Sequence, residues 1–323
     1  MTREVTELRF AYLSGGVGGA RLARGLCAVL PPERLSIIVN TADDFRHWGL
    51  WISPDLDSVM YSVAGLSDEA RGWGLLDDRF DTLAAMARLE PEFPDEAPSW
   101  FQLGGRDLAT HLTRSAALTS GQRLTEITLR LGRALGLRHA LLPMSDEPAP
   151  SFIHTKTGER LTFQDWLVKR RAADPVARVE LSRPMPSAEV LQALSQADVV
   201  LFAPSNPYVS LDPILALPGV RERVAARPVV AVSPILAGAA VKGPLAEMIR
   251  DLEGVAASPR AVCEHYGGLV SACLVEPEDA AQLAEERATR YLAGDTRIPG
   301  LSEATRLARQ VIEAAERLCE GAL

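Results

Sequence analysis

The stretch FAYLSGGVGGAR, residues 10–21, decides the fold of this chain. It opens with an apolar run, Phe10–Leu13, of the kind found in strands buried inside a parallel sheet. A glycine-rich loop, Gly15–Gly19, then leads into a segment with the apolar spacing of a helix. A strand that turns into a helix through such a loop begins a βαβ unit, so we expect an α/β protein with a parallel sheet.

The alternation of strands and helices continues through the rest of the chain. Pro31-Pro32 stops the first helix, and the apolar run Leu35–Val39 is the second strand. Further strands are expected at 139–143, 197–202, 228–232 and 268–274, and further helices at 277–290 and 302–319. The alternation predicts a single Rossmann-like domain over residues 1–323, with a doubly wound, mostly parallel sheet. Helical spacing dominates the segment at about 56–138, which we interpret as a mostly helical insertion.

The glycine loop is a candidate phosphate site. Its four glycines, Gly15, Gly16, Gly18 and Gly19, remove the side chains that would keep a ligand away from the backbone amides. Those amides and the positive end of the following helix favour an anion, so we predict that the loop binds a nucleotide or another phosphate ester. The loop has neither the spacing of the dinucleotide motif nor the Lys-Ser/Thr pair of a Walker loop. The alternative is a tight packing turn without a ligand.

Three other loops also follow predicted strands, at residues 40–44, 203–207 and 233–238. In doubly wound sheets, ligands bind beyond the carboxyl ends of the strands, near the point where the strand order reverses. We therefore expect these loops to meet the glycine loop at one crevice.

Four carboxylates are crowded into the segment after the second strand: Asp43, Asp44, Asp55 and Asp57. Mg²⁺ prefers carboxylate oxygen, water and substrate phosphate as ligands. A phosphate loop beside clustered carboxylates is what metal-assisted phosphoryl transfer requires, so we predict Mg²⁺ as the cofactor. Asp55 follows a proline before a helical segment, and we interpret it as a helix cap, whereas Asp44 and Asp57 have the better claim to catalysis. The alternative for each aspartate is a cap or a solvated turn.

Three further sites carry polar residues suited to a ligand. Arg106 opens a helix and suits a phosphate or the edge of a planar ring; its alternative is a capping turn with a surface ion pair. Ser205-Asn206 lies between two prolines and suits a base or a phosphate, with a plain turn as the alternative. Lys242 offers a cation beside a glycine, or else belongs to an ordinary loop before a helix.

Composition excludes several classes of protein. The 34 basic and 42 acidic residues give a net charge of −8, which argues against a nucleic-acid partner. The N-terminus is polar, unlike a signal peptide, and the longest apolar stretch, Val229–Val241, is interrupted by Pro234 and too short to span a bilayer. We therefore expect a soluble, cytoplasmic protein that does not bind a membrane. A homodimer is plausible only because such dimers are common.

Seven segments occur in the order of a known family, from about Leu13 to Pro244. They are SGGVGGARLARGL, VNTADDFRHWGLWISPDLDSVMYSVAGL, GGRDLATHL, LLPMSD, FQDWLVKRR, APSNPYVSLDPILALPGVR and VAVSPILAGAAVKGP. Together they resemble the 2-phospho-L-lactate transferase family of deazaflavin coenzyme biosynthesis. The C-terminal helices also fit, so the resemblance covers nearly the whole chain.

The resemblance implies a reaction between two small molecules. The donor is a guanylylated three-carbon phosphoacid, carrying a phospholactyl, phosphoenolpyruvyl or phosphoglyceryl group. The acceptor is the deazariboflavin precursor Fo, whose terminal ribityl hydroxyl attacks the phosphorus next to the three-carbon acid. A phosphodiester forms and GMP leaves, with Mg²⁺ assisting. The sequence does not identify the three-carbon acid.

The resemblance also implies roles for individual residues. The glycine loop, Gly15–Gly19, would face the donor phosphates, and Ser205-Asn206, with Lys242, would lie by the nucleotide. Asp43 or Asp44 would bind Mg²⁺, while Asp57 would hold or deprotonate the acceptor hydroxyl. Arg106 would lie near the acceptor.

Two positions depart from the family pattern. The family commonly has Asp where this chain has Gly105, and it commonly reads Ser-Ile-Gly-Pro where this chain has Ser210-Leu211-Asp212-Pro213. The extra carboxylate of Asp212 could change contacts to the metal or the donor.

Two other interpretations of the sequence remain. The gluconeogenesis-factor-like family shares the glycine loop and an Asp-Asp segment, and would make this chain a non-catalytic regulator that binds nucleotide sugars. The PDLD, RDLATH and PSNP segments favour the transferase. A nicotinamide dehydrogenase fits less well, because Asp43 lies 27 positions beyond Gly16, where about 20 is usual.

Overall fold

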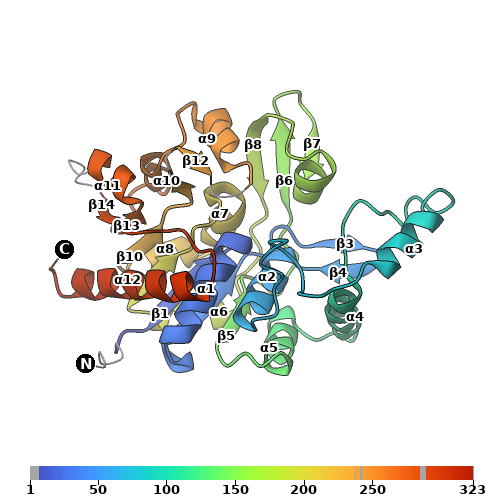
Figure 1. The fold of residues 1–323 in the computed structure, drawn as a ribbon, viewed down its shortest axis with the longest axis horizontal. Coiled ribbons are helices and arrows are strands. Elements are labelled where there is room, and N and C mark those ends of the chain that lie inside the picture. Colours follow the sequence, from blue (N-terminus) through green and yellow to red (C-terminus); the bar gives the residue numbers. More distant parts are fainter. Residues whose placement is uncertain (1–6, 237, 241–242, 284–288, 323) are drawn as a thin grey trace.

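A seven-stranded, all-parallel sheet forms the centre of the computed structural model, which describes residues 7–236, 238–240, 243–283 and 289–322 (Figure 1). The strand order is β14-β13-β10-β9-β1-β2-β5. The strands are β1 (Phe10–Ser14), β2 (Leu35–Val39), β5 (Ala140–Pro143), β9 (Val199–Phe202), β10 (Val229–Val232), β13 (Ala272–Val275) and β14 (Arg290–Ala293). The predicted α/β class with a doubly wound parallel sheet is confirmed.

The strand order reverses beside β1. From β1 the chain moves outward to β2 and β5, and then returns to the other side of β1 as β9. Phe10 is in register with Leu35 of β2 on one side and with Val199 of β9 on the other. The loops that follow β1 and β9 therefore emerge side by side, at the switch point where doubly wound sheets bind ligands.

Alternate residues of β1 point into two different cores. Phe10 and Tyr12 pack with α1 (Val17–Val29), α2 (Pro54–Val63) and α12 (Leu301–Cys319) on one face of the sheet. Ala11 and Leu13 pack on the other face, with α6 (Ala188–Gln196), α8 (Val220–Ala225) and α9 (Leu245–Glu253). Both faces are thus covered, which explains why β1 reads as a continuous apolar run rather than an alternating one.

Four helices and a hairpin lie between β2 and β5. The hairpin is β3 (Phe45–His47) with β4 (Leu50–Ile52), and the helices are α2, α3 (Asp81–Leu89), α4 (Gly105–Thr119) and α5 (Leu124–Ala134). α3 and the hairpin extend away from the central sheet (Figure 1), whereas Leu56, Val59 and Met60 of α2 belong to its core. The segment after the second strand, which carries the four aspartates, therefore contains the hairpin and the first turn of α2, and its loop-like composition did not predict either.

A second, antiparallel sheet between β5 and β9 has no counterpart in the sequence predictions. It has the order β7-β6-β8 and contains β6 (Ser151–Thr155), β7 (Arg160–Thr162) and β8 (Val176–Leu181). η2 (Asp165–Lys169) connects β7 to β8. The three strands are short and partly exposed, so they lack the continuous apolar runs that revealed the central strands.

The end of the chain differs from the prediction in one place. The helix expected over 277–290 is α11 (Pro277–Leu283), and Arg290 begins β14 instead. β14 is the parallel edge strand beside β13, with Ala272 in register with Arg290. The remaining short elements are η1 (Pro32–Arg34), η3 (Pro207–Leu211), α7 (Asp212–Leu215), β11 (Ile235–Leu236), β12 (Ala239–Ala240) and α10 (Pro259–His265).

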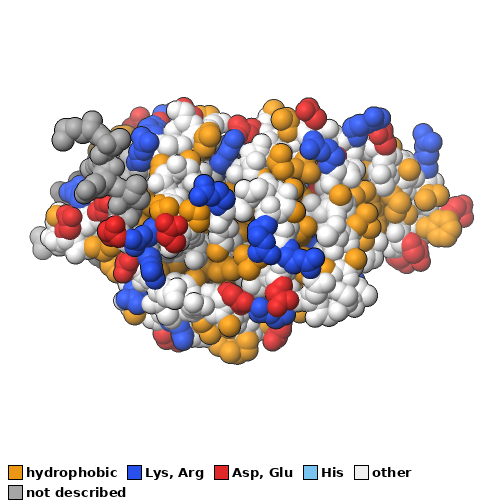
Figure 2. All heavy atoms as spheres, turned by 90° about the horizontal axis from the view of Figure 1, so that it is seen from below, with side chains coloured by type: hydrophobic (Ala, Val, Ile, Leu, Met, Phe, Trp, Pro, Cys, Tyr) orange, Lys and Arg blue, Asp and Glu red, His pale blue; other side chains and the backbone are white. Residues whose placement is uncertain are grey.

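Two properties of the described residues bear on possible partners. No helix among them is both long and apolar enough to cross a lipid bilayer. On the face seen in Figure 2, basic and acidic side chains are interspersed, and neither kind gathers into a continuous patch.

Candidate active site

The glycine loop packs directly against the loop after β9. The Gly15 amide donates to Ser205 Oγ at 3.2 Å, and a Cβ on Gly18 would lie 2.6 Å from the Pro204 carbonyl oxygen. A Cβ on Gly15 would collide with Ser210, and one on Gly19 with Ser14. The glycines are therefore needed for close packing of two loops, as the alternative interpretation held.

The start of α1 nevertheless offers free backbone donors. Gly16 is the N-cap residue, no side chain caps the helix, and its first turn holds no acidic residue. The first amides of a helix have no partner within the helix, and they carry the positive end of its dipole. A phosphate at this place would satisfy them, so close packing and phosphate binding are compatible.

Asn40 joins the acidic residues to this loop. It follows β2 directly, is fully buried, and donates through Nδ2 to Asp43 Oδ1 at 2.7 Å and to Asp55 Oδ2 at 3.0 Å. A Cβ on Gly16 would lie 2.6 Å from Asp55 Oδ1, which puts Asp55 against the glycine loop. Asn40 was not among the predicted site residues, although its place at the carboxyl end of a central strand was a usable signal.

Asp55 is part of this site and is not the helix cap that we expected. Ser53 occupies the N-cap position of α2, and Asp55 is the second residue of the helix. Burial raises the pKa of the Asp55 carboxyl to about 7, against the lowering effect of the Asn40 hydrogen bond. Burial also raises the pKa of Asp43, and the nearby charges of Asp55 and Asp44 raise it further. The pair therefore favours a proton or a cation between its oxygens.

Asp44 presents one carboxylate oxygen without a partner. Its Oδ2 accepts from Ser53 Oγ at 2.7 Å and from Trp51 Nε1 at 3.1 Å. Its Oδ1 is buried and has no hydrogen-bond partner among the described atoms. Burial raises the pKa of Asp44, while Ser53, the Arg114 charge and Trp51 act in the opposite direction. An unsatisfied buried oxygen is costly, which makes it a natural contact for a ligand or an ion.

These three aspartates offer the kind of ligand that Mg²⁺ prefers, but among the described residues only Asp57, Asp107 and His111 bring their ligand atoms within 4.8 Å of one another. All are buried, all offer hard oxygen ligands, and one oxygen of Asp44 is unsatisfied. Within the part of the chain that the structure describes, Asp43 and Asp55 form no ion pair with Lys, Arg or His, so no protein cation balances them.

Asp57 belongs to a separate cluster around Arg114. Both of its carboxylate oxygens contact the guanidinium, with Oδ2 at 3.0 Å from one terminal nitrogen, and Arg114 is only 1% exposed. His111 Nδ1 lies 3.6 Å from Asp57 Oδ2, and His111 Nε2 lies 3.2 Å from Asp107 Oδ1. Asp57, Asp107 and His111 could surround a metal ion, but Arg114 already supplies a positive charge at that place.

The Arg114 cluster was missed in the sequence analysis. Asp107, His111 and Arg114 are spaced i, i+4 and i+7 on α4, which places them on one helix face. Tyr61 of α2 joins them, and its hydroxyl donates to Asp107 Oδ1 at 2.6 Å. The spacing was visible in the sequence, but their partner Asp57 was not, because α2 and α4 lie far apart in the chain.

The other predicted site residues are Ser205, Asn206, Arg106 and Lys242. Ser205 contacts it directly, whereas the side chain of Asn206 begins η3 by accepting from the Tyr208 amide at 3.0 Å. Arg106 is exposed and donates to the Leu76 carbonyl at 2.7 Å, so it is not packed with the other predicted residues. Lys242 lies outside the described residues.

A groove lies beside the start of α1. It is formed by α1, α2, the turn at 67–74 and the segment 298–304, and its cavity volume is about 30 Å³, with further space open to solvent. Its lining combines aliphatic side chains with Trp73, two arginines of α1 and serines of α2. Asp55, Ser58 and Ser62 are spaced i, i+3 and i+7 on α2, so the groove continues the helix face that meets the glycine loop.

A cluster of aromatic rings lies around β3. Phe45 and His47 of β3 contact Trp100, with ring centroids 5.7 and 5.2 Å away, and Lys169 Nζ lies 4.4 Å from the Trp100 ring centre. These rings pack the hairpin that follows Asp44. Burial lowers the pKa of His47 to about 4, so its imidazole is neutral at pH 7.

A glycine loop, an uncapped helix start and buried carboxylates at a switch point are typical of α/β proteins that bind phosphate esters. Comparison with known proteins identifies the family. The family model for 2-phospho-L-lactate transferase CofD matches residues 11–315, so the chain belongs to the 2-phospho-L-lactate transferase family.

Named relatives match along almost the whole chain. A phosphoenolpyruvate transferase of Streptomyces griseus is 37% identical over 96% of this chain and 99% of its own length. A 2-phospho-L-lactate transferase of Methanosarcina mazei is 36% identical over 93% of this chain and 98% of its own. A member of the upf0052 family from Bacillus halodurans has a solved structure with a TM-score of 0.58, at 19% identity over 95% of this chain and 99% of that one. At that identity, it confirms the fold alone.

Proposed function

We propose that this chain transfers a phosphoenolpyruvyl group from a guanosine-diphosphate-linked donor to the ribityl hydroxyl of Fo, with release of GMP. The observation that carries the proposal is the group of buried carboxylates, Asp43, Asp44 and Asp55, beside the glycine loop in a member of this family. The name of the Streptomyces griseus relative supports phosphoenolpyruvyl over phospholactyl or phosphoglyceryl.

The bonds that change involve one phosphorus atom. The ribityl oxygen forms a bond to the phosphorus that carries the three-carbon acid, and the bond from that phosphorus to the bridging oxygen breaks. GMP leaves with the electron pair, and the hydroxyl proton passes to a base. Such a transfer depends mainly on positioning and on neutralisation of charge, which agrees with a site rich in carboxylates and backbone amides.

The free amides at the start of α1 are proposed to hold the donor phosphates, with Ser205 fixing the loop. Asp43 and Asp55, bridged by Asn40, are proposed as the Mg²⁺ ligands. When bound, Mg²⁺ supplies positive charge that neutralises the phosphates of the donor. This assignment adds Asp55 to the ligands that the sequence suggested.

Asp44 is our candidate for the base, because burial raises its pKa and Oδ1 is unpartnered. Asp57 can accept a further hydrogen bond from the acceptor hydroxyl, since a carboxylate has about four acceptor positions. Both of its oxygens already contact Arg114, which fixes the position of the carboxylate. We therefore propose that Asp57 orients the acceptor and Asp44 receives the proton.

The groove beside Trp73 is proposed to hold the ring system of the acceptor. Its aliphatic lining and Trp73 suit a flat aromatic group, and the serines and arginines suit polar edges.

A turnover assay tests the proposal. Purified protein, Fo and Mg²⁺ are incubated with each of the three guanylylated donors in turn, while product mass and GMP release are followed. The proposal predicts product at the highest kcat/KM with the phosphoenolpyruvyl donor. Absence of product with all three, together with nucleotide-sugar binding, would favour the regulator instead.

A further inference from the structure

The side chains of Tyr208, Asp212, Glu253 and His265 form a charged cluster next to η3. His265, the last residue of α10, has Nδ1 at 2.8 Å from Glu253 Oε1 and Nε2 at 2.8 Å from Asp212 Oδ2. The Tyr208 hydroxyl donates to the same Glu253 oxygen at 2.6 Å, and its ring lies 4.5 Å from the imidazole. The cluster thereby links η3, α7, α9 and α10.

Both ring nitrogens of His265 face carboxylate oxygens. A neutral imidazole has one N–H, so it could satisfy only one of these contacts, whereas the charged form donates in both directions. Burial acts to lower the pKa of His265, but the hydrogen bonds and charges of Asp212 and Glu253 outweigh it and raise the pKa. Tyr208 and Tyr266 also face the ring, and Arg221 donates to the Tyr266 carbonyl.

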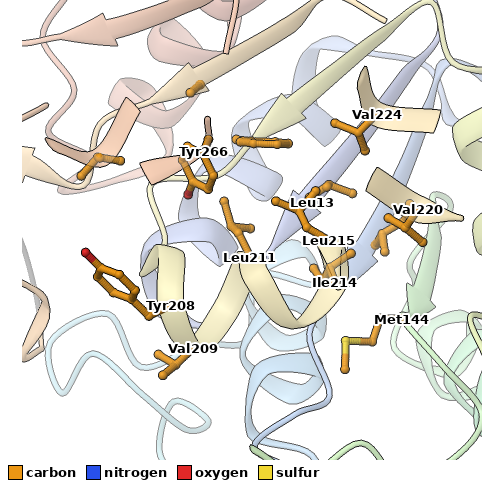
Figure 3. Close-up of a cluster of buried hydrophobic side chains, with 14 of the residues drawn as sticks. Leu13, Met144, Tyr208, Val209, Leu211, Ile214, Leu215, Val220, Val224 and Tyr266 are labelled. Carbon is orange, nitrogen blue, oxygen red and sulfur yellow. The ribbon is translucent and has the colours of Figure 1, made fainter. Parts of the chain in front are cut away.

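The opposite side of η3 touches the candidate active site. Ser210 occupies the space that a Cβ on Gly15 would need, and the Val209 carbonyl accepts from Asn40 Nδ2 at 3.3 Å. Val209 and Leu211 belong to a buried cluster, with Tyr208 at its edge and the Tyr208 hydroxyl directed away from it (Figure 3). The charged cluster and the glycine loop therefore hold the same short segment from two sides.

We propose that His265 is a positioning residue: by binding Asp212 and Glu253 at once, it holds η3 and the Ser205-Asn206 loop against the glycine loop. The consequence for donor binding rests on the function proposed above, but the clamp itself does not.

Amide hydrogen exchange of residues 205–211 tests the clamp without relying on turnover. The matched variants are His265→Gln, which keeps one donor and no charge, and His154→Gln, which breaks the His154–Glu180 contact on the antiparallel sheet. We expect exchange over 205–211 to be about tenfold faster in His265→Gln and unchanged in His154→Gln, since local opening depends on the contacts that close it. In the turnover assay, His265→Gln should raise the donor KM with little change in kcat.

The pH dependence of amide exchange distinguishes a positioning role of His265 from simple packing. In the wild type, protection of 205–211, corrected for intrinsic exchange, should fall as the pH rises through the pKa of His265. Asp212→Asn removes one carboxylate that stabilises the charged ring, so the midpoint should move to lower pH. Equal protection in wild type and His265→Gln, or a midpoint unmoved by Asp212→Asn, would overturn the clamp. If no donor reacts with the wild type, the proposed function fails while the exchange result still stands.

Discussion

At the scale of single residues, one buried amide group holds the acidic site together. Asn40 Nδ2 contacts one carboxylate from the loop after β2 and one from α2, and the Asn40 backbone amide donates to the Ser14 carbonyl at 2.9 Å. Without this donor, Asp43 and Asp55 would face each other as like charges in a buried place. The site is thus stabilised by protonation or by a cation, and its behaviour should depend on pH and on metal.

Asp55→Asn should change how stability depends on pH in the metal-free protein. The pKa of Asp55 rises from an ordinary 3.8 to about 7 on folding, so between these values the folded state holds a proton that the unfolded state has lost. The free energy of unfolding should therefore fall as the pH rises from about 4 to about 7. Urea unfolding with a chelator present should show a weaker fall in Asp55→Asn, with the remainder due to Asp43. An identical slope in both proteins would contradict the assignment.

Arg114→Met should destabilise the fold strongly, because it leaves Asp57 buried without a counter-charge. We expect a loss of about 3–5 kcal/mol in the free energy of unfolding. The double variant Arg114→Met/Asp57→Leu should recover a large part of it, since neither charge is then buried alone.

The matched control for Arg114 is an exposed pair, Arg170 with Glu159. Arg170→Met should change the urea midpoint little, because exposed ion pairs contribute little to stability. Equal losses for Arg114→Met and Arg170→Met would show that burial of the Asp57 pair has no special effect.

At the scale of elements, the strand–loop–helix unit at residues 10–29 was predictable, and its contacts were not. The apolar runs of β1, β2 and β10 located the strands, because strands covered on both faces need no alternation. The short strands β6–β8 and the pairing of Asp57 with Arg114 depend on contacts between distant segments, which no local pattern records. Asp55 was wrongly interpreted as a helix cap for the same reason, because its neighbours Asn40 and Gly16 come from other elements.

Gly18→Ala tests the close approach of the two loops at the switch point. The added Cβ would lie 2.6 Å from the Pro204 carbonyl oxygen, so the backbone of one loop must move. We expect a loss of about 1–3 kcal/mol in stability and weaker donor binding. The control is Gly105→Ala, whose Cβ would lie at an ordinary 3.5 Å from the Arg79 carbonyl oxygen and should preserve both. Donor affinity by calorimetry and urea unfolding measure the two effects; unchanged donor affinity in Gly18→Ala would contradict the loop's role.

At the scale of the whole molecule, three parts meet at one edge of the sheet. The switch point provides the glycine loop, the segment between β2 and β5 provides the carboxylates, and the groove beside α1 extends from both. This arrangement puts the proposed acceptor groove next to the start of α1, where the donor phosphates are proposed to bind. It also predicts that a substitution in the acceptor groove can weaken Fo binding without weakening donor binding.

Trp73→Ala should raise the KM for Fo about tenfold while the donor KM stays within twofold, because stacking of one ring on an aromatic side chain is worth roughly that much. Trp100→Ala is the control, since Trp100 lies in the aromatic cluster of the β3–β4 hairpin. Steady-state kinetics with each substrate varied in turn give both values. A raised KM for Fo in Trp100→Ala alone would move the acceptor to the hairpin side.

The most direct test of the central claim is the Mg²⁺ dependence of GMP release in wild type, Asp55→Asn and Asp57→Asn. If Asp43 and Asp55 hold the metal, Asp55→Asn should lower kcat by on the order of a hundredfold and shift half-maximal activity to much higher Mg²⁺. Asp57→Asn should reduce activity without shifting the Mg²⁺ midpoint. A wild-type Mg²⁺ midpoint in Asp55→Asn, with the shift found in Asp57→Asn instead, would place the metal in the Arg114 cluster and contradict this account.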